Sequence, residues 1–93
     1  MPEPYERRRW RKTEKRELVG DYKILAGCAD CGYRGHPAAL DFDHLPEYEK
    51  EDNVSNMVAA NRTLVDIFAE IEKCQVVCAN CHRIRTWVRR MER

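Results

Sequence analysis

Aromatic side chains are scarce in this chain: Phe, Trp and Tyr make up 9% of its 93 residues, whereas charged side chains make up 35%. A chain of this length forms one domain close to the lower size limit for a self-sufficient core. With so few large apolar side chains, only a modest core can be buried. A bound metal ion is a reasonable supplement, because a metal site that exists only in the folded chain contributes directly to folding.

The sequence also lacks long apolar runs, low-complexity linkers and any internal repeat beyond a doubled Cys-x-x-Cys. No run is long enough to span a membrane, and no secretory signal pattern is present. We therefore expect a cytoplasmic protein that makes no contact with a membrane. In such a reducing compartment, closely paired cysteines favour zinc over disulfide bonds.

Four of the five cysteines fall in two Cys-x-x-Cys pairs, Cys28 with Cys31 and Cys78 with Cys81. Two tight turns of this kind bring four thiolates to one ion, which predicts a tetrahedral structural zinc site. Gly32 follows the first pair and permits its tight backbone. The alternatives are coincidental buried thiols or a redox pair, although the βαβ setting of a redox pair is missing. The fifth cysteine, Cys74, is expected to be a small buried residue at a helix end.

The formal net charge of +1 hides a segregation of charge along the chain. The middle, from Asp41 to Glu72, is acidic. Basic side chains crowd the two ends, at Arg7, Arg8, Arg9, Arg11, Lys12, Lys15 and Arg16 and again at Arg83, Arg85, Arg89, Arg90 and Arg93. Trp10 and Trp87 lie among them, and basic ends with tryptophan are typical of a phosphate-binding surface. The alternative is two solvated helix faces.

Hydrophobic periodicity predicts an α+β fold. Helices are expected at residues 4–26 with a break at Gly20, at 54–60, at 64–73 and from residue 81 or 82 onward, and strands are expected at 38–44 and 75–77. The first helix has few apolar side chains and is expected to be partly free. Thr63 and Asp66 have the spacing of a helix cap. The last helix is expected to turn its arginines outward and to pack through Ile84, Trp87, Val88 and Met91.

The strand-like run at residues 40–44, Leu-Asp-Phe-Asp-His, ends in an adjacent acid and imidazole. A carboxylate and an imidazole can hold a divalent cation, and a further histidine can take a proton from water. Because neighbouring strand residues point to opposite faces, Asp43 and His44 are not expected to bind the same ion. His82, at the start of the basic helix, would complete the cluster. The alternative is that both histidines are ordinary structural residues, as is expected for His36 in its loop.

The order Cys-x-x-Cys, Asp-His and Cys-x-x-Cys-His before a basic helix resembles the zinc-knuckle branch of the HNH endonucleases, especially the small ones of bacteriophages. The resemblance covers roughly residues 27–86 and rests on residues 40–44 together with Cys-Ala-Asn-Cys-His-Arg at 78–83. It implies a small zinc-stabilised ββα-metal fold, of the His-Me finger type, with extra helices. Residues 1–26 would form a basic N-terminal helical arm and residues 27–93 the nuclease domain.

The resemblance also implies a metal-dependent endonuclease that hydrolyses phosphodiester bonds in DNA. His44 is similar to the general base of that family, and Asp43 and His82 resemble its ligands of a catalytic divalent ion. Mg²⁺ or Mn²⁺ is expected there, with Ni²⁺ or Zn²⁺ as alternatives. The structural zinc takes no part in the chemistry. The side chains expected to bind backbone phosphates are Arg7, Arg8, Arg9, Arg11, Lys12, Arg83, Arg85, Arg89 and Arg90.

One residue departs from the family's pattern. The family often has an asparagine shortly before the third cysteine, where this chain has Lys73, which leaves Asn61, Asn80 or no residue for that role. The alternative function is a non-catalytic, zinc-stabilised module that binds DNA or protein, or an accessory subunit of a phage DNA-packaging machine with a large partner such as terminase. A monomer or weak dimer in the cytoplasm of an infected bacterium is expected, and nicking and double-strand cutting both stay open.

Overall fold

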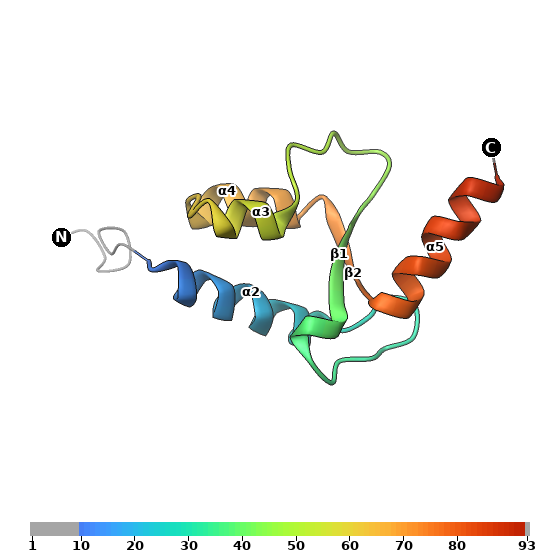
Figure 1. The fold of residues 1–93 in the computed structure, drawn as a ribbon, viewed down its shortest axis with the longest axis horizontal. Helices are drawn as coiled ribbons and strands as arrows, with labels where there is room; N and C mark the ends of the chain where they lie inside the picture. The colour runs from blue at the N-terminus through green and yellow to red at the C-terminus, as the bar shows by residue number, and fades with distance from the viewer. Residues whose placement is uncertain (1–9, 93) are drawn as a thin grey trace.

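The computed structural model describes residues 10–92. This part of the chain forms a small α+β structure of four α-helices and one two-stranded antiparallel sheet (Figure 1). The elements are α2 (Lys12–Ala26), the 3-10 turn η1 (Pro37–Ala39), β1 (Leu40–His44), α3 (Val54–Ala59), α4 (Leu64–Ile71), β2 (Cys74–Cys78) and α5 (Ala79–Met91). The predicted α+β class is confirmed. The expectations for Arg7, Arg8, Arg9 and Arg93 lie outside the described residues.

The two strands pair along their whole lengths, from Leu40 opposite Cys78 to His44 opposite Cys74. Both predicted strands are confirmed, but β1 begins two residues later than expected. The segment before it forms η1 instead, because a proline opens that turn and the His36 imidazole accepts a backbone N–H within it.

The two sides of the sheet have different coverings. Phe42 packs on the side of α2 and α4, where its ring centroid lies 6.1 Å from that of Tyr22, which in turn lies 5.9 Å from that of Phe68. Asp41 and Asp43 point to the opposite side, where they contact α5. Figure 1 shows this arrangement, with α2, α3 and α4 on one side of the strands and α5 on the other. The predicted alternation of β1 is confirmed, and its polar face lies against a helix.

Helices α3 and α4 were both expected where they occur. Thr63 caps α4, since its hydroxyl oxygen accepts the Asp66 N–H at 3.1 Å, as predicted. Together with α2 they bury one apolar cluster, which consists of Val19, Val54, Met57, Val58, Ile67 and Ile71. Within residues 10–92, no helix combines the length and the apolar character that crossing a membrane requires.

Helix α2 is more closely packed than its sparse apolar residues predicted. It continues through Gly20, where an added Cβ would lie 3.4 Å from η1, so the glycine permits close approach and does not break the helix. Val19 is only 6% exposed. Lys15 is also buried, and its Nζ donates to Asn61 Oδ1 at 2.9 Å and to the backbone oxygen of Arg62 at 2.7 Å. The lysine therefore fastens α2 to the turn between α3 and α4, with its aliphatic stem covered and its ammonium group hydrogen-bonded to neutral oxygen atoms.

We expect Lys15→Met to destabilise the protein by about 1.5–3 kcal/mol, because it removes charge-assisted hydrogen bonds from a buried position. Urea unfolding of the zinc-loaded protein measures the loss. Lys12→Met is the matched control, since Lys12 is exposed on the same helix, and it should change stability by less than about 0.5 kcal/mol. Equal effects of the two substitutions would contradict this account of how α2 is held.

The expected orientation of α5 is wrong. Its apolar residues Ile84, Trp87 and Met91 are 60%, 62% and 65% exposed, whereas Arg85 and Arg89 reach towards the sheet. The physical reason is that the face of the sheet beneath α5 presents carboxylates, which bind guanidinium groups and offer no apolar contact. The helix also begins at Ala79, earlier than expected, because the thiol of the preceding cysteine caps it.

Candidate metal centre and functional site

Four cysteine sulfur atoms converge at one end of the sheet. The Sγ atoms of Cys28, Cys31, Cys78 and Cys81 all lie within 4.8 Å of one another. Tetrahedral zinc with Zn–S bonds of about 2.3 Å places its sulfur ligands about 3.8 Å apart. The Cys31 and Cys78 sulfurs are 3.7 Å apart, which fits that geometry. The predicted cluster is confirmed, and its chemistry suits a structural ion such as zinc.

Local backbone geometry explains why the first Cys-x-x-Cys forms a knuckle. The Gly32 N–H donates to the Cys28 carbonyl oxygen at 2.8 Å, which closes the turn. Gly32 has a φ of 81°, a region that glycine enters without steric cost. The Ala29 N–H donates to the Val76 carbonyl oxygen at 2.8 Å and so ties the turn to β2. Since β2 ends at Cys78, these bonds bring the two halves of the cluster together.

The thiols differ in how readily they ionise. Burial disfavours the thiolate of Cys28, but backbone hydrogen bonds from both knuckles outweigh burial and lower its pKa to about 6. The neighbouring Cys78 sulfur and burial raise the pKa of Cys81. The thiolate of Cys28 thus forms easily, while the thiol of Cys81 resists ionisation beside it. A divalent cation at the centre removes that resistance, because metal binding requires and stabilises the deprotonated ligands.

Two other candidate residues lie outside this cluster. Cys74 is half-buried, donates to the Glu70 carbonyl oxygen at 3.4 Å, and has a pKa raised by burial to about 11. His36 is exposed and its Nδ1 accepts the Ala38 N–H at 3.0 Å. His36 is a surface residue as expected, whereas Cys74 is only half-buried and begins β2.

Asp43 and His82 meet on the α5 side of the sheet. His82 Nε2 lies 3.7 Å from Asp43 Oδ1, and His82 Nδ1 lies 3.0 Å from Asp41 Oδ2. Because a carboxylate accepts, Nδ1 donates to Asp41, and Nε2 is turned towards Asp43. A metal-ligating histidine is commonly oriented by a carboxylate on its other nitrogen, and Asp41 contacts His82 in that way. Asp43 and His82 therefore lie close together, and their shared binding of an ion stays a prediction.

Asp43 also has strong basic partners. Arg89 binds it with two hydrogen bonds of 2.8 Å, and Arg85 donates to its Oδ2 at 2.8 Å. Arg85 further donates twice to Asp30 at 2.7 Å, which links the first knuckle to α5. Burial opposes ionisation of Asp43, but the hydrogen bonds from Arg89 and Arg85 outweigh it and lower its pKa. The charges of these two arginines are thus largely compensated inside the protein.

His44 lies on the other side of the sheet from Asp43. Its Nε2 is 2.8 Å from Oε2 of Glu70, a glutamate that is only 1% exposed. Burial opposes ionisation of Glu70, but hydrogen bonds from Lys73 and His44 outweigh it and lower its pKa. Glu70 is therefore a carboxylate at neutral pH and accepts the hydrogen from Nε2. The Nδ1 of His44 is left as its basic atom.

Lys73 joins this network to the loop that follows β1. Its Nζ donates to Glu70 Oε1 and to the Glu49 carbonyl oxygen, both at 2.9 Å. The two asparagines considered for this role lie elsewhere. Asn61 accepts from α2, as described above, and Asn80 is an exposed residue of the first turn of α5. Lys73 therefore holds the loop behind His44 together with Glu70, which accepts the Glu51 N–H at 3.1 Å.

Three residues that contact the candidate site were given no role in it from the sequence: Asp41, Glu70 and Lys73. A signal existed for Asp41, because a residue two positions before Asp43 must share its face of the strand. Glu70 falls three residues after Ile67, within the apolar stripe of α4, where a charge requires a buried partner. That pattern marks the residue but does not name its partner.

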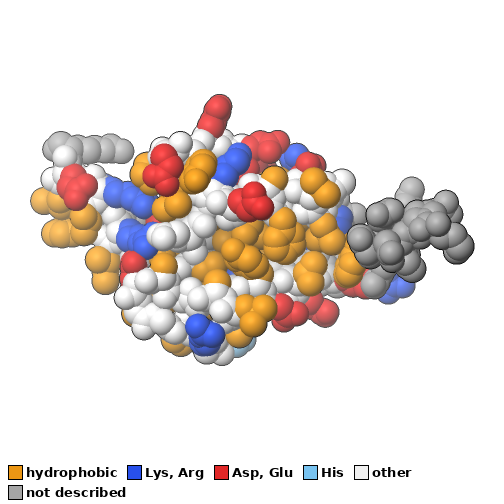
Figure 2. Space-filling model, turned by 180° about the vertical axis from the view of Figure 1, so that it is seen from behind, with side chains coloured by type: hydrophobic (Ala, Val, Ile, Leu, Met, Phe, Trp, Pro, Cys, Tyr) orange, Lys and Arg blue, Asp and Glu red, His pale blue; other side chains and the backbone are white. Residues whose placement is uncertain are grey.

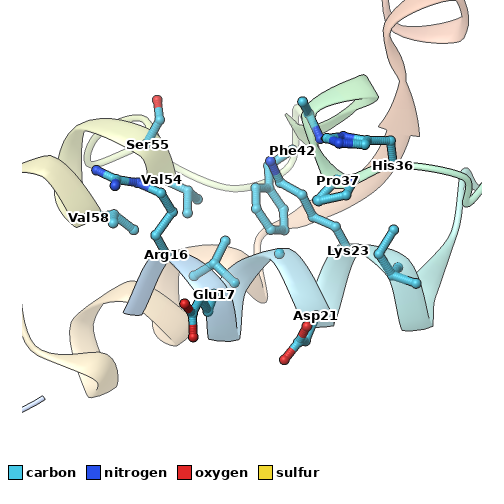
Figure 3. Close-up of a pocket in the computed structure, with 14 residues that line it drawn as sticks. Arg16, Glu17, Asp21, Lys23, His36, Pro37, Phe42, Val54, Ser55 and Val58 are labelled. Carbon is cyan, nitrogen blue, oxygen red and sulfur yellow. The ribbon is translucent and has the colours of Figure 1, made fainter. Parts of the chain in front are cut away.

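Two grooves border the helices. One, of about 570 Å³, lies between α2, α3 and β1 and is mainly apolar, with Val54, Val58 and Phe42 among its walls (Figure 3). The other, of about 700 Å³, runs along α5 and includes Asp41 and His82. Figure 2 shows hydrophobic and basic side chains next to one another at the left end, where α5 lies. Of the two grooves, the second adjoins the cluster that His82 forms with Asp41 and Asp43.

Comparisons of the chain with protein-family models, with curated proteins and with solved structures find no match. What the chain does therefore has to be inferred from its own residues. These provide a thiol cluster, an acid–imidazole cluster on each side of the sheet, and a groove along α5.

Proposed function

We propose that this chain is a zinc-stabilised, metal-dependent endonuclease of the HNH type that hydrolyses phosphodiester bonds in DNA. The observation that supports it most is the meeting of Asp43, near the end of β1, with His82, in the first turn of α5, beside a groove with basic walls. The thiol cluster fixes the start of α5 against the strands and so holds His82 in place.

Asp43 and His82 would hold the divalent cation, with Mg²⁺ or Mn²⁺ as the expected ions. Asp43 Oδ2 accepts from both Arg85 and Arg89, but Oδ1 accepts only from Arg89 among the described residues. A carboxylate oxygen has two lone pairs, so Oδ1, which faces His82, keeps one for a cation. Such an ion would supply Lewis-acid stabilisation of charge on the phosphate and on the leaving 3′ oxygen.

His44 would act as the general base. The buried Glu70 fixes its orientation and its tautomer, so that Nδ1 can take a proton from the attacking water. A base that is oriented by a third group is a recurrent arrangement in catalytic sites. Asp43 and His44 lie on opposite faces, but they are adjacent at the end of β1, which pairs only with β2 in the described part of the chain. A phosphate at the free edge of β1 would lie between them.

Lys73 would replace the asparagine that the HNH family often has before its third cysteine. It holds the loop after His44 through the Glu49 carbonyl oxygen, which is the positioning task that such an asparagine performs. In this proposal Lys73 stands in place of the asparagine and makes the equivalent contact with the loop. A DNA-packaging partner such as terminase is a further proposal, for which pulldown of a large partner is the test.

We expect His44→Ala to lower plasmid nicking by at least about a hundredfold, which is the usual range for the loss of a general base. His44→Gln should be equally inactive, since its amide can donate to Glu70 but cannot take a proton. Nicking is measured with zinc-loaded protein, with Mg²⁺ or Mn²⁺ omitted and then added. His36→Ala is the matched control and should cut normally, because His36 is exposed and its hydrogen bond is to Ala38 in the η1 turn. Normal cutting by His44→Gln would contradict the assignment of the base.

The second candidate is a zinc-stabilised module that binds nucleic acid without cutting it. Specific observations favour it: Asp43 already has two guanidinium partners, and His44 points away from the His82 side of the sheet. If folded, zinc-loaded wild-type protein binds DNA but does not nick it with any divalent ion, this second function is the correct one.

A further inference from the structure

The groove along α5 combines basic, aromatic, acidic and imidazole side chains. Its volume is about 700 Å³, and Arg83, Trp87 and Arg90 line one stretch of it, with Asp41 and His82 also in its wall. Residues spaced by three and four along a helix lie on the same side of it. The three side chains therefore form a continuous strip that leads away from His82.

The arginines of α5 divide into two classes. Arg85 and Arg89 are paired with buried or knuckle carboxylates, as described above. Arg83 and Arg90 have no ion pair or hydrogen bond to a side chain within residues 10–92, and both are exposed. Their positive charge is available to a ligand. The groove thus has uncompensated basic side chains before and after its aromatic residue, which suits a polyanion.

Trp87 is 62% exposed although it is the largest side chain of α5. An indole that is open to solvent can stack on the apolar face of a nucleobase. The arginines on either side of it can bind the backbone phosphates that precede and follow that nucleotide. Bases within a duplex are stacked on one another and turn only their edges outward. An indole on a helix surface reaches the face of a base only when the strand is unpaired.

We propose that this groove binds a single-stranded segment of nucleic acid, with one base stacked on Trp87 and the flanking phosphates held by Arg83 and Arg90. The inference rests on the proposed action on DNA and specifies the form of the substrate. Because the strip begins beside His82, the bound strand runs towards the cluster of His82, Asp41 and Asp43. The preferred substrate is then a single strand, or a duplex with an unpaired stretch at the site.

The test is binding of a labelled oligothymidylate of about 16 nucleotides, and of a duplex of the same length, followed by fluorescence anisotropy. The protein is zinc-loaded and no other divalent ion is added, so cleavage does not interfere. Trp87→Ala should weaken binding of the single strand by about 5- to 150-fold, which is the usual contribution of one stacked base, and should leave duplex binding unchanged. Trp87→Phe should retain part of the affinity, because it keeps an aromatic face.

Val88→Ala is the matched control, since Val88 is a neighbouring α5 residue outside the groove, and it should bind as the wild type does. Arg83→Gln and Arg90→Gln should each reduce the salt dependence of log affinity by about 0.7 for a single strand. The inference is overturned if Trp87→Ala binds the single strand normally, or if it loses single strand and duplex equally. His44-dependent nicking with normal binding by Trp87→Ala would remove only this inference. If single-strand binding depends on Trp87 but no variant or wild type nicks DNA, the proposed nuclease function is wrong and the proposed binding groove stands.

Discussion

Removal of a metal ion held by the four cysteines is expected to unfold the protein. Cys28 and Cys78 are part of the second apolar cluster, which they form with Leu40, Val76 and Val77, so the thiol site and half of the core are one structure. Structural zinc contributes about 10–16 kcal/mol of apparent free energy in small domains. A domain has a total stability of about 5–15 kcal/mol, so little would remain without the ion.

Cys78→Ser tests this expectation together with chelation of the wild type. Both treatments should abolish the cooperative thermal transition that circular dichroism follows. Metal analysis of the untreated wild type should find one zinc per folded chain. Cys74→Ser is the matched control, because its thiol lies outside the cluster and donates a hydrogen bond to a backbone oxygen. A metal-free wild type that melts cooperatively near the temperature of the loaded protein would contradict a structural role for zinc.

The parts of the fold that were predictable from sequence are those fixed by local rules. The alternation of apolar and acidic residues at 40–44 predicted the two faces of β1, and the cap at Thr63 predicted where α4 begins. The cysteine spacing predicted the thiol cluster because two tight turns leave little freedom for the sulfur atoms. Each of these inferences needed only the residues of one segment, or two segments joined by a common ligand.

The orientation of α5 was not predictable in the same way. Periodicity identified its apolar residues, but which side of the helix faces the sheet depends on what the sheet presents. The buried Asp43 draws in Arg85 and Arg89, whose spacing of four residues places them on one side of the helix. The contacts of Glu70 were hidden for the same reason, since its partner His44 lies on a different element. Long-range pairing of charges leaves no periodic trace in a single sequence.

Loss of the Glu70 carboxylate is the other change for which a large effect is expected. Its side chain is 1% exposed and accepts from His44, from Lys73 and from the Glu51 N–H. Glu70→Ala would leave a histidine and a lysine without their buried partner, and breaking such a pair typically costs about 3–5 kcal/mol. The loop after β1 would lose two of its anchors at once. Urea unfolding of the zinc-loaded protein measures the destabilisation.

Glu70→Gln separates the charge of this residue from its shape. The folded pKa of Glu70 lies below its unfolded value of about 4.3, so its charge stabilises the fold fully above that pH and loses this effect as the pH falls through the folded pKa. The stability difference between wild type and Glu70→Gln should therefore shrink on acidification. Glu72→Ala, an exposed neighbour on the same segment, should show no such pH-dependent difference. A difference that stays constant down to low pH would mean that Glu70 stabilises the protein through packing, and that His44 is not held by a charged partner.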